Sequence, residues 1–140
     1  MDDKETLKNI LLFHGGENVL FESAERFGDP SELYKELVKQ GRFWPMKNMV
    51  RLLGRSGHCQ DNVLELIGKH PRKYRMVIGF ALSSGGTWYY HVWILVKSTG
   101  TIGETADRYH AYFGVIVASI AKGPTQGDSP KPTLHITFRN

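Results

Sequence analysis

The sequence has very little cysteine: Cys59 is the only one in 140 residues. A single cysteine cannot form a disulfide within the chain, which agrees with a reducing compartment. No apolar run approaches the roughly 20 residues that a membrane-spanning helix needs. The N-terminal Met-Asp-Asp-Lys-Glu also does not have the basic and then apolar order of a secretion signal. We therefore expect a cytoplasmic protein with no membrane partner.

The chain also lacks internal repeats and any segment that resembles a linker. Its 41% of apolar and 23% of charged residues are typical of a globular protein rather than a disordered one. A length of 140 residues is common for one domain and is enough to bury a core. The sequence thus predicts one domain over residues 1–140, and it carries no signal for the oligomeric state.

Negative charge is in the minority. The formal net charge is +4, and much of the excess lies in two segments, residues 39–55 and 69–75. Such segments can bind nucleic acid or an acidic protein, so a non-catalytic basic binding module is the alternative function. No nucleic-acid-binding motif accompanies them. Solvated helix faces and loops are therefore the favoured interpretation, and nucleic acid is the less favoured partner.

The first half of the chain has apolar residues at helical spacing. This spacing predicts four helices, over residues 6–13, 29–41, 46–53 and 59–68. The second of them has the clearest start, because Asp29-Pro30-Ser31-Glu32 combines a capping residue, a proline at the helix entrance and a glutamate at the capping-box position. Residues 18–27 do not distinguish helix from strand.

The second half changes to the pattern of strands. Strands are predicted over residues 76–82, 87–96, 101–105, 111–119 and 134–138, with a loop over 122–132. The first two are apolar at nearly every position, which is typical of strands covered on both faces. Helices followed by strands predict an α+β fold, with a helical part over about 1–70 packed on an antiparallel sheet over about 71–140.

Three polar residues in this order can carry chemistry. Cys59 begins a helix, where free N–H groups and the helix dipole favour a thiolate. His91 lies in the middle of an apolar strand and can accept the thiol proton and later return it. Glu104 follows thirteen positions later, after a turn, so a returning strand can bring it beside His91 to fix the imidazole tautomer. The expected roles are nucleophile, general base and orienting group.

Each of these residues also has a plainer interpretation. Cys59 can be a small core residue, His91 a buried histidine bonded to a carbonyl, and Glu104 a surface charge. Asp107, a backbone carbonyl or water could then orient His91 instead. A zinc site that includes His58 is disfavoured by the ligand spacing, so we expect no metal and no cofactor.

An acyl-transfer site also needs donors for an oxyanion. The backbone N–H of Cys59 is the natural first donor, and Asn48 and His58 are candidates for the second. Alternate residues of a strand share a face, so Tyr89 and Trp93 lie on the side of His91 and can wall a cleft. Packing in the core and at its rim is the favoured role for the aromatic residues of this strand.

The order of cysteine helix, histidine strand and acid strand resembles the papain-like fold in its broad sense, most closely its transglutaminase-like branch. The matching segments are Gly-His-Cys-Gln-Asp-Asn at 57–62, Tyr-His-Val-Trp at 90–93 and Ile-Gly-Glu-Thr at 102–105, together with Gly-Phe-Ala-Leu at 79–82. The resemblance covers roughly residues 46–117. In that branch the third residue is usually Asp or Asn rather than Glu, and an aromatic residue often follows the cysteine, where this chain has Gln60.

This resemblance implies a papain-like cysteine hydrolase or acyltransferase of the protease, amidase or deamidase type. Cys59, His91 and Glu104 would form its catalytic triad, acting on an amide, ester or thioester carbonyl. The implied partner is a protein, a peptide or a small substrate with such a carbonyl. A member of the same fold that keeps the cleft without the chemistry is a further alternative.

Overall fold

The computed structural model describes residues 2–26, 28–46, 49–52, 54–55, 58–106, 108–125 and 132–138. Their elements are α1 (Asp3–His14), β1 (Asn18–Leu20), α2 (Glu22–Glu25), α3 (Ser31–Gln40), β2 (Arg42–Pro45), β3 (Val50–Arg51), α4 (Cys59–Lys69), β4 (Tyr74–Leu82), β5 (Thr87–Val96), β6 (Thr101–Glu104), β7 (Ala111–Thr125) and β8 (Pro132–Phe138). The fold is α+β, as the order of helical and strand patterns predicts.

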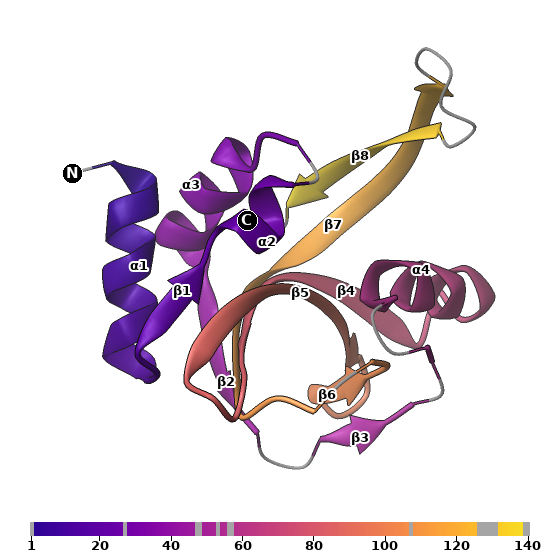
Figure 1. The fold of residues 1–140 in the computed structure, drawn as a ribbon. Coiled ribbons are helices and arrows are strands. Elements are labelled where there is room, and N and C mark those ends of the chain that lie inside the picture. The colour runs from indigo at the N-terminus through magenta and orange to yellow at the C-terminus, as the bar shows by residue number, and fades with distance from the viewer. Residues whose placement is uncertain are drawn as a thin grey trace.

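One curled sheet connects all the described strands. Its order is β2-β7-β4-β5-β6-β3, with β1 added to β5 and β8 to β7. The long central pairs are antiparallel, as expected, whereas the short pairs β1–β5 and β3–β6 are parallel, so the sheet is mixed. Figure 1 shows β4, β5 and β6 curving around a common centre, with the helices outside the curve.

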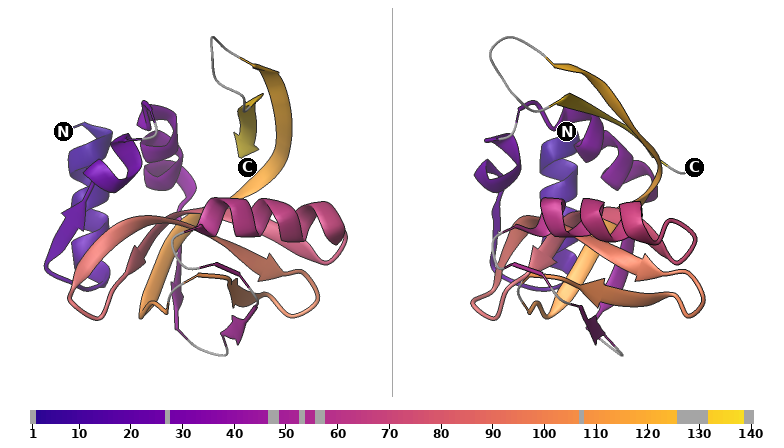
Figure 2. Two further views of the ribbon diagram at one scale, coloured as in Figure 1. Left: turned by 45° about the vertical axis from the view of Figure 1, so that its right-hand side comes forward. Right: turned by 90° about the vertical axis from the view of Figure 1, so that its right-hand side faces the viewer.

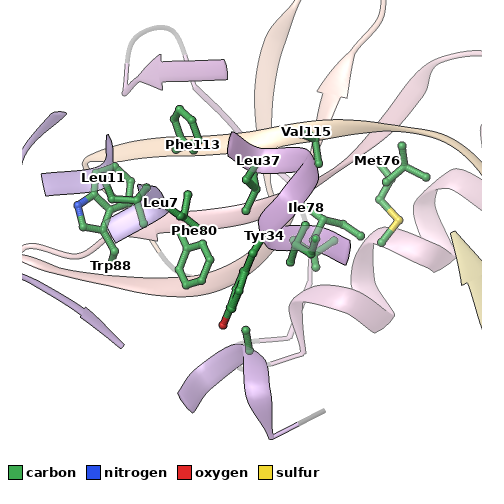
Figure 3. Close-up of a cluster of buried hydrophobic side chains, with 14 of the residues drawn as sticks. Leu7, Leu11, Tyr34, Leu37, Met76, Ile78, Phe80, Trp88, Phe113 and Val115 are labelled. Atoms are coloured by element: carbon green, nitrogen blue, oxygen red, sulfur yellow. The ribbon is translucent and has the colours of Figure 1, made fainter. Parts of the chain in front are cut away.

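The curl gives the sheet two apolar faces with different partners. On the outer face, α1 and α3 supply Leu7, Leu11 and Leu37, which pack around Phe80 and Trp88 (Figure 3). The inner face carries a second cluster, formed by Val77 and Ala81 of β4, Trp93 and Leu95 of β5, Ile102 of β6 and Tyr112 of β7. Because successive side chains of a strand point to opposite faces, β4 and β5 contribute to both clusters. His91 is on the inner face.

The predicted helix over residues 46–53 is wrong. Val50 and Arg51 form β3, which pairs with Gly103 and Glu104 of β6, and the Leu52 N–H donates to the Glu104 carbonyl at 2.9 Å. The helical spacing of the apolar residues is real, but backbone pairing with β6 takes precedence over this local pattern. Together with β1 and β2, this strand means that the first 70 residues are not a purely helical part.

The C-terminal strands are also longer than expected. β7 continues to Thr125, and β8 begins at Pro132, so residues 122–125 and 132 are strand rather than loop. Lys122 pairs with Leu134 and Thr125 with Pro132, which shows that hairpin pairing extends a strand through residues with low strand propensity. Figure 2 shows the β7–β8 ribbon rising from the sheet on the side that carries the helices, and α4 lying along β4 and β5.

Within the described part of the chain, none of the helices combines the length and the apolar character that a membrane crossing requires.

The close approach of β4 and β7 gives a test of this packing. A Cβ at Gly79 would collide with the Phe113 carbonyl oxygen and lie 2.5 Å from the Gly114 Cα. We expect Gly79→Ala to lower the free energy of unfolding by roughly 1–3 kcal/mol, the usual cost of overpacking a core. Urea denaturation measures the change.

Gly68→Ala is the matched control, because a Cβ there would have no atom within 4 Å and Gly68 lies in α4. Replacing a helical glycine by alanine stabilises by about 0.5–1 kcal/mol. A Gly79→Ala protein as stable as the wild type would contradict the observed β4–β7 packing.

Candidate active site

His91 is the centre of the candidate site. It lies in the middle of β5 with 2% of its surface exposed. Three aromatic rings surround it, with ring centroids 4.5 Å away for Tyr109, 6.0 Å for Trp93 and 6.3 Å for Tyr112. An imidazole enclosed in this way needs polar partners for both of its nitrogens.

Glu104 is the first of those partners. Its Oε1 and Oε2 lie 2.8 Å and 3.1 Å from His91 Nε2. The carboxylate is completely buried and accepts two further hydrogen bonds, from the Tyr112 hydroxyl to Oε1 at 2.8 Å and from the Ala106 N–H to Oε2 at 2.9 Å. Buried charges are tolerated when they are paired and hydrogen-bonded, and these three donors meet that requirement.

The geometry around Glu104 also assigns the roles of the two ring nitrogens of His91. An ionised carboxylate can only accept hydrogen bonds, so Nε2 must carry a proton and donate it. Nδ1 is then the ring nitrogen that remains for another partner. Asp107, the alternative orienting residue, lies outside the described residues.

Cys59 is the second partner of His91. It is the first residue of α4, which packs on β4 and β5, and its side chain is partly exposed. The His91 side chain and the backbone of Val92 and Gln60 lie close enough to its sulfur to act on the pKa of the thiol. The structure therefore brings Cys59, His91 and Glu104 together in one row.

The electrostatics of this row favour a thiolate beside an imidazolium. Burial raises the pKa of the Cys59 thiol, but the hydrogen bond and positive charge of His91, with the backbone of Val92 and Gln60, outweigh it and lower the pKa overall. Burial lowers the pKa of His91, whereas hydrogen bonds and negative charges from Cys59 and Glu104 raise it to about 9. The pKa of the thiol is lowered and the pKa of the imidazole is raised, and both changes favour transfer of the proton from sulfur to imidazole.

Tyr112 is a part of the site that the sequence analysis missed. Burial and the negative charge of Glu104 raise the pKa of Tyr112, so its hydroxyl stays protonated and donates to the carboxylate. Strand alternation is the one signal that could have found it, since Tyr112 of β7 lies on the inner face of the sheet and pairs with Trp44 of β2. Tyr109, whose ring packs on His91, lies outside any strand and had no such signal.

The structure places three of the predicted accessory residues. Trp93 is completely buried in the inner cluster, so it packs beside His91 instead of walling an open cleft. His58 is a surface residue: its Nδ1 lies 3.8 Å from Asp61 Oδ2, and its backbone N–H donates to the Arg55 carbonyl at 3.1 Å. Its role as an oxyanion donor stays a prediction. Tyr89 is half-buried on β5.

Asn48, the other candidate for the second oxyanion donor, lies outside the described residues. The backbone N–H of Cys59 remains the natural first donor, because N–H groups in the first turn of a helix have no partner within the helix. Among the residues that the structure describes, no group of three or more His, Cys, Asp or Glu side chains is placed to hold a metal ion.

Comparisons of this chain with protein-family models, with curated proteins and with solved structures found no match. The chemistry of the site therefore has to carry the functional argument.

The first prediction from this site concerns the Cys59 thiol. Its rate of alkylation by iodoacetamide should rise with pH through an apparent pKa below the ordinary thiol value of about 8.5. His91→Ala should move this pKa upward, because the hydrogen bond and the positive charge that hold the thiolate are lost. At pH values below the thiol pKa of both proteins, the alkylation rate of His91→Ala should be lower than that of the wild type by about tenfold for each unit of that increase. Identical pH profiles for the wild type and His91→Ala would show that His91 does not act on the Cys59 thiol.

The second prediction concerns the buried carboxylate. Tyr112→Phe removes one of three donors to Glu104, and a hydrogen bond to a charged group contributes about 1.5–3 kcal/mol. We expect the free energy of unfolding to fall by that amount in urea denaturation. Tyr34→Phe is the control, because its hydroxyl is 3.4 Å from Glu25, whose side chain is 35% exposed. Equal losses in the two variants would argue against a special role for Tyr112.

Proposed function

We propose that this protein is an enzyme that uses a cysteine nucleophile for acyl transfer. The observation that carries the proposal is the row of Cys59, His91 and Glu104, in which a thiol at a helix start shares a histidine with a completely buried carboxylate. More narrowly, we propose a hydrolase or acyltransferase that acts on an amide, ester or thioester carbonyl of a protein, a peptide or a small substrate. The resemblance to the transglutaminase-like branch of the papain-like proteins points the same way.

The proposed reaction follows from the roles of the three side chains. The Cys59 thiolate attacks the carbonyl carbon and forms a tetrahedral oxyanion, which the N–H groups of the first turn of α4 can stabilise. The carbon–leaving-group bond then breaks, and the His91 imidazolium gives its proton to the leaving amine, alcohol or thiol. A thioester to Cys59 remains. Glu104 stabilises the imidazolium throughout without taking its proton.

The acyl group then passes to a second nucleophile. Water, deprotonated by His91, gives the acid and regenerates the thiol, which is the hydrolase outcome. An amine gives a new amide, which is the acyltransferase outcome. A free thiol as nucleophile is suited to the reducing cytoplasm, which we propose as the compartment of this protein.

The alternative, a basic binding module, draws no support from the site. It needs neither a lowered thiol pKa nor a buried imidazole–carboxylate pair, both of which are costly to maintain. Several basic side chains of the two segments also have partners within the chain. Lys69 pairs with Glu65 at 2.9 Å, and Arg42 and Lys73 lie over aromatic rings.

The proposal predicts that Cys59 becomes acylated. Incubation with 4-nitrophenyl acetate should release nitrophenol in a burst and leave one acetyl group on the peptide that contains Cys59, detected by mass spectrometry. Cys59→Ala should abolish the burst and the adduct, while its circular dichroism spectrum stays that of the wild type.

A Cys59→Ala protein that keeps full turnover would overturn this mechanism. Nucleic-acid binding with a steep dependence on salt, found together with an unreactive thiol, would support the binding module instead.

A further inference from the structure

We infer that Asn62 is a positioning residue of this site, which holds the start of α4 against the segment that follows Glu104. Asn62 does not contact the reacting atoms in this scheme. It acts through the backbone that carries Cys59 on one side and Glu104 on the other. The inference rests on the proposed function, because a positioning role has meaning only if Cys59 must stay beside His91.

Asn62 makes three hydrogen bonds with one buried side chain. Its Oδ1 accepts from the Arg55 N–H at 3.2 Å, and its Nδ2 donates to the Arg55 carbonyl at 2.8 Å and to the Thr105 carbonyl at 3.3 Å. Only 7% of the residue is exposed. A carboxamide offers a donor and an acceptor at once, which neither Asp in its ionised form nor Ala can do.

These bonds join the two halves of the candidate site. Asn62 lies in α4 three residues after Cys59, and its partner Thr105 directly follows Glu104. The chain that precedes α4 also holds Glu104 directly, because the Leu52 N–H donates to the Glu104 backbone carbonyl at 2.9 Å. The chain before α4 and the chain after β6 therefore meet at the Asn62 amide.

The packing around Gly54 is a second, independent observation of the same junction. A Cβ at Gly54 would collide with the Thr105 carbonyl oxygen and would lie 2.7 Å from Asn62 Nδ2 and 2.9 Å from its Cγ. Any side chain at position 54 would therefore force Thr105, Asn62 or the Gly54 backbone to shift. The junction can thus be opened from two sides, either by removing the amide or by adding a methyl group at Gly54.

A purely structural role for Asn62 makes a different prediction from a positioning role. If the amide only stabilises the fold, its loss lowers the melting temperature and leaves the ionisation of Cys59 unchanged. If it positions α4, its loss separates the sulfur from His91, so the thiolate loses its partner. The pH profile of thiol alkylation distinguishes the two roles.

The experiment measures the iodoacetamide alkylation rate of the full chain from about pH 5 to about pH 10 in four proteins. In Asn62→Ala and Gly54→Ala we expect the apparent thiol pKa to rise, with the rate at mildly acidic pH falling about tenfold for each unit of the rise. The rate at the alkaline plateau should stay as in the wild type. Val63→Ala is the control, because Val63 is the next residue of α4 and is completely buried, but its apolar side chain makes no hydrogen bond at the junction. It should lower the melting temperature and leave the profile unchanged.

Two variants keep the test decisive if one of them fails to fold, since either alone reports on the junction. Wild-type profiles in the folded Asn62→Ala or Gly54→Ala protein would overturn the inference while leaving the proposed function intact. An ordinary thiol pKa in the wild type itself would overturn the proposed function, and the inference with it. A shift of the same size in Val63→Ala would also overturn the inference, because it would assign the effect to lost stability.

Discussion

The arrangement of the site depends on the burial of one carboxylate. Glu104 has no exposed surface, and its charge is compensated by His91, the Tyr112 hydroxyl and the Ala106 N–H. Removing a carboxylate from water is costly, and only such a complete set of donors offsets the cost. The same requirement makes His91 Nε2 a donor to Glu104 and leaves Nδ1 for Cys59. Burying the Glu104 carboxylate therefore also determines which donors surround it and how His91 is oriented.

The curl of the sheet makes this constraint possible. A flat sheet would expose its second face, whereas here β6 and β7 bring Ile102, Glu104 and Tyr112 around the inner face of β5. Trp93 and Tyr109 fill the space next to His91. Apolar neighbours strengthen the hydrogen bonds among buried polar groups, because the local dielectric constant is low. The outer face packs on helices, and one of them, α4, supplies Cys59 to the site.

The sequence predicts more of the strands than of the connections between them. The strand alternation around His91 assigns its face, and the thirteen residues to Glu104 match the strand, turn and strand that the structure contains. The apolar spacing over residues 46–53 misleads, because pairing of β3 with β6 depends on partners about fifty positions away. The same limit applies to the hydrogen bonds of Tyr112 to Glu104 and of Asn62 to Thr105, which depend on the tertiary fold. The extension of β7 to Thr125 likewise depends on β8.

The central claim is that His91 is an imidazolium shared by a thiolate and a carboxylate. Nitrogen-15 NMR of the His91 ring at pH 7 tests it most directly, because the two ring nitrogens report their protonation separately. The account predicts that both nitrogens carry a proton and that the ring loses one only near its pKa of about 9. A neutral imidazole at pH 7, with one unprotonated nitrogen, would contradict it.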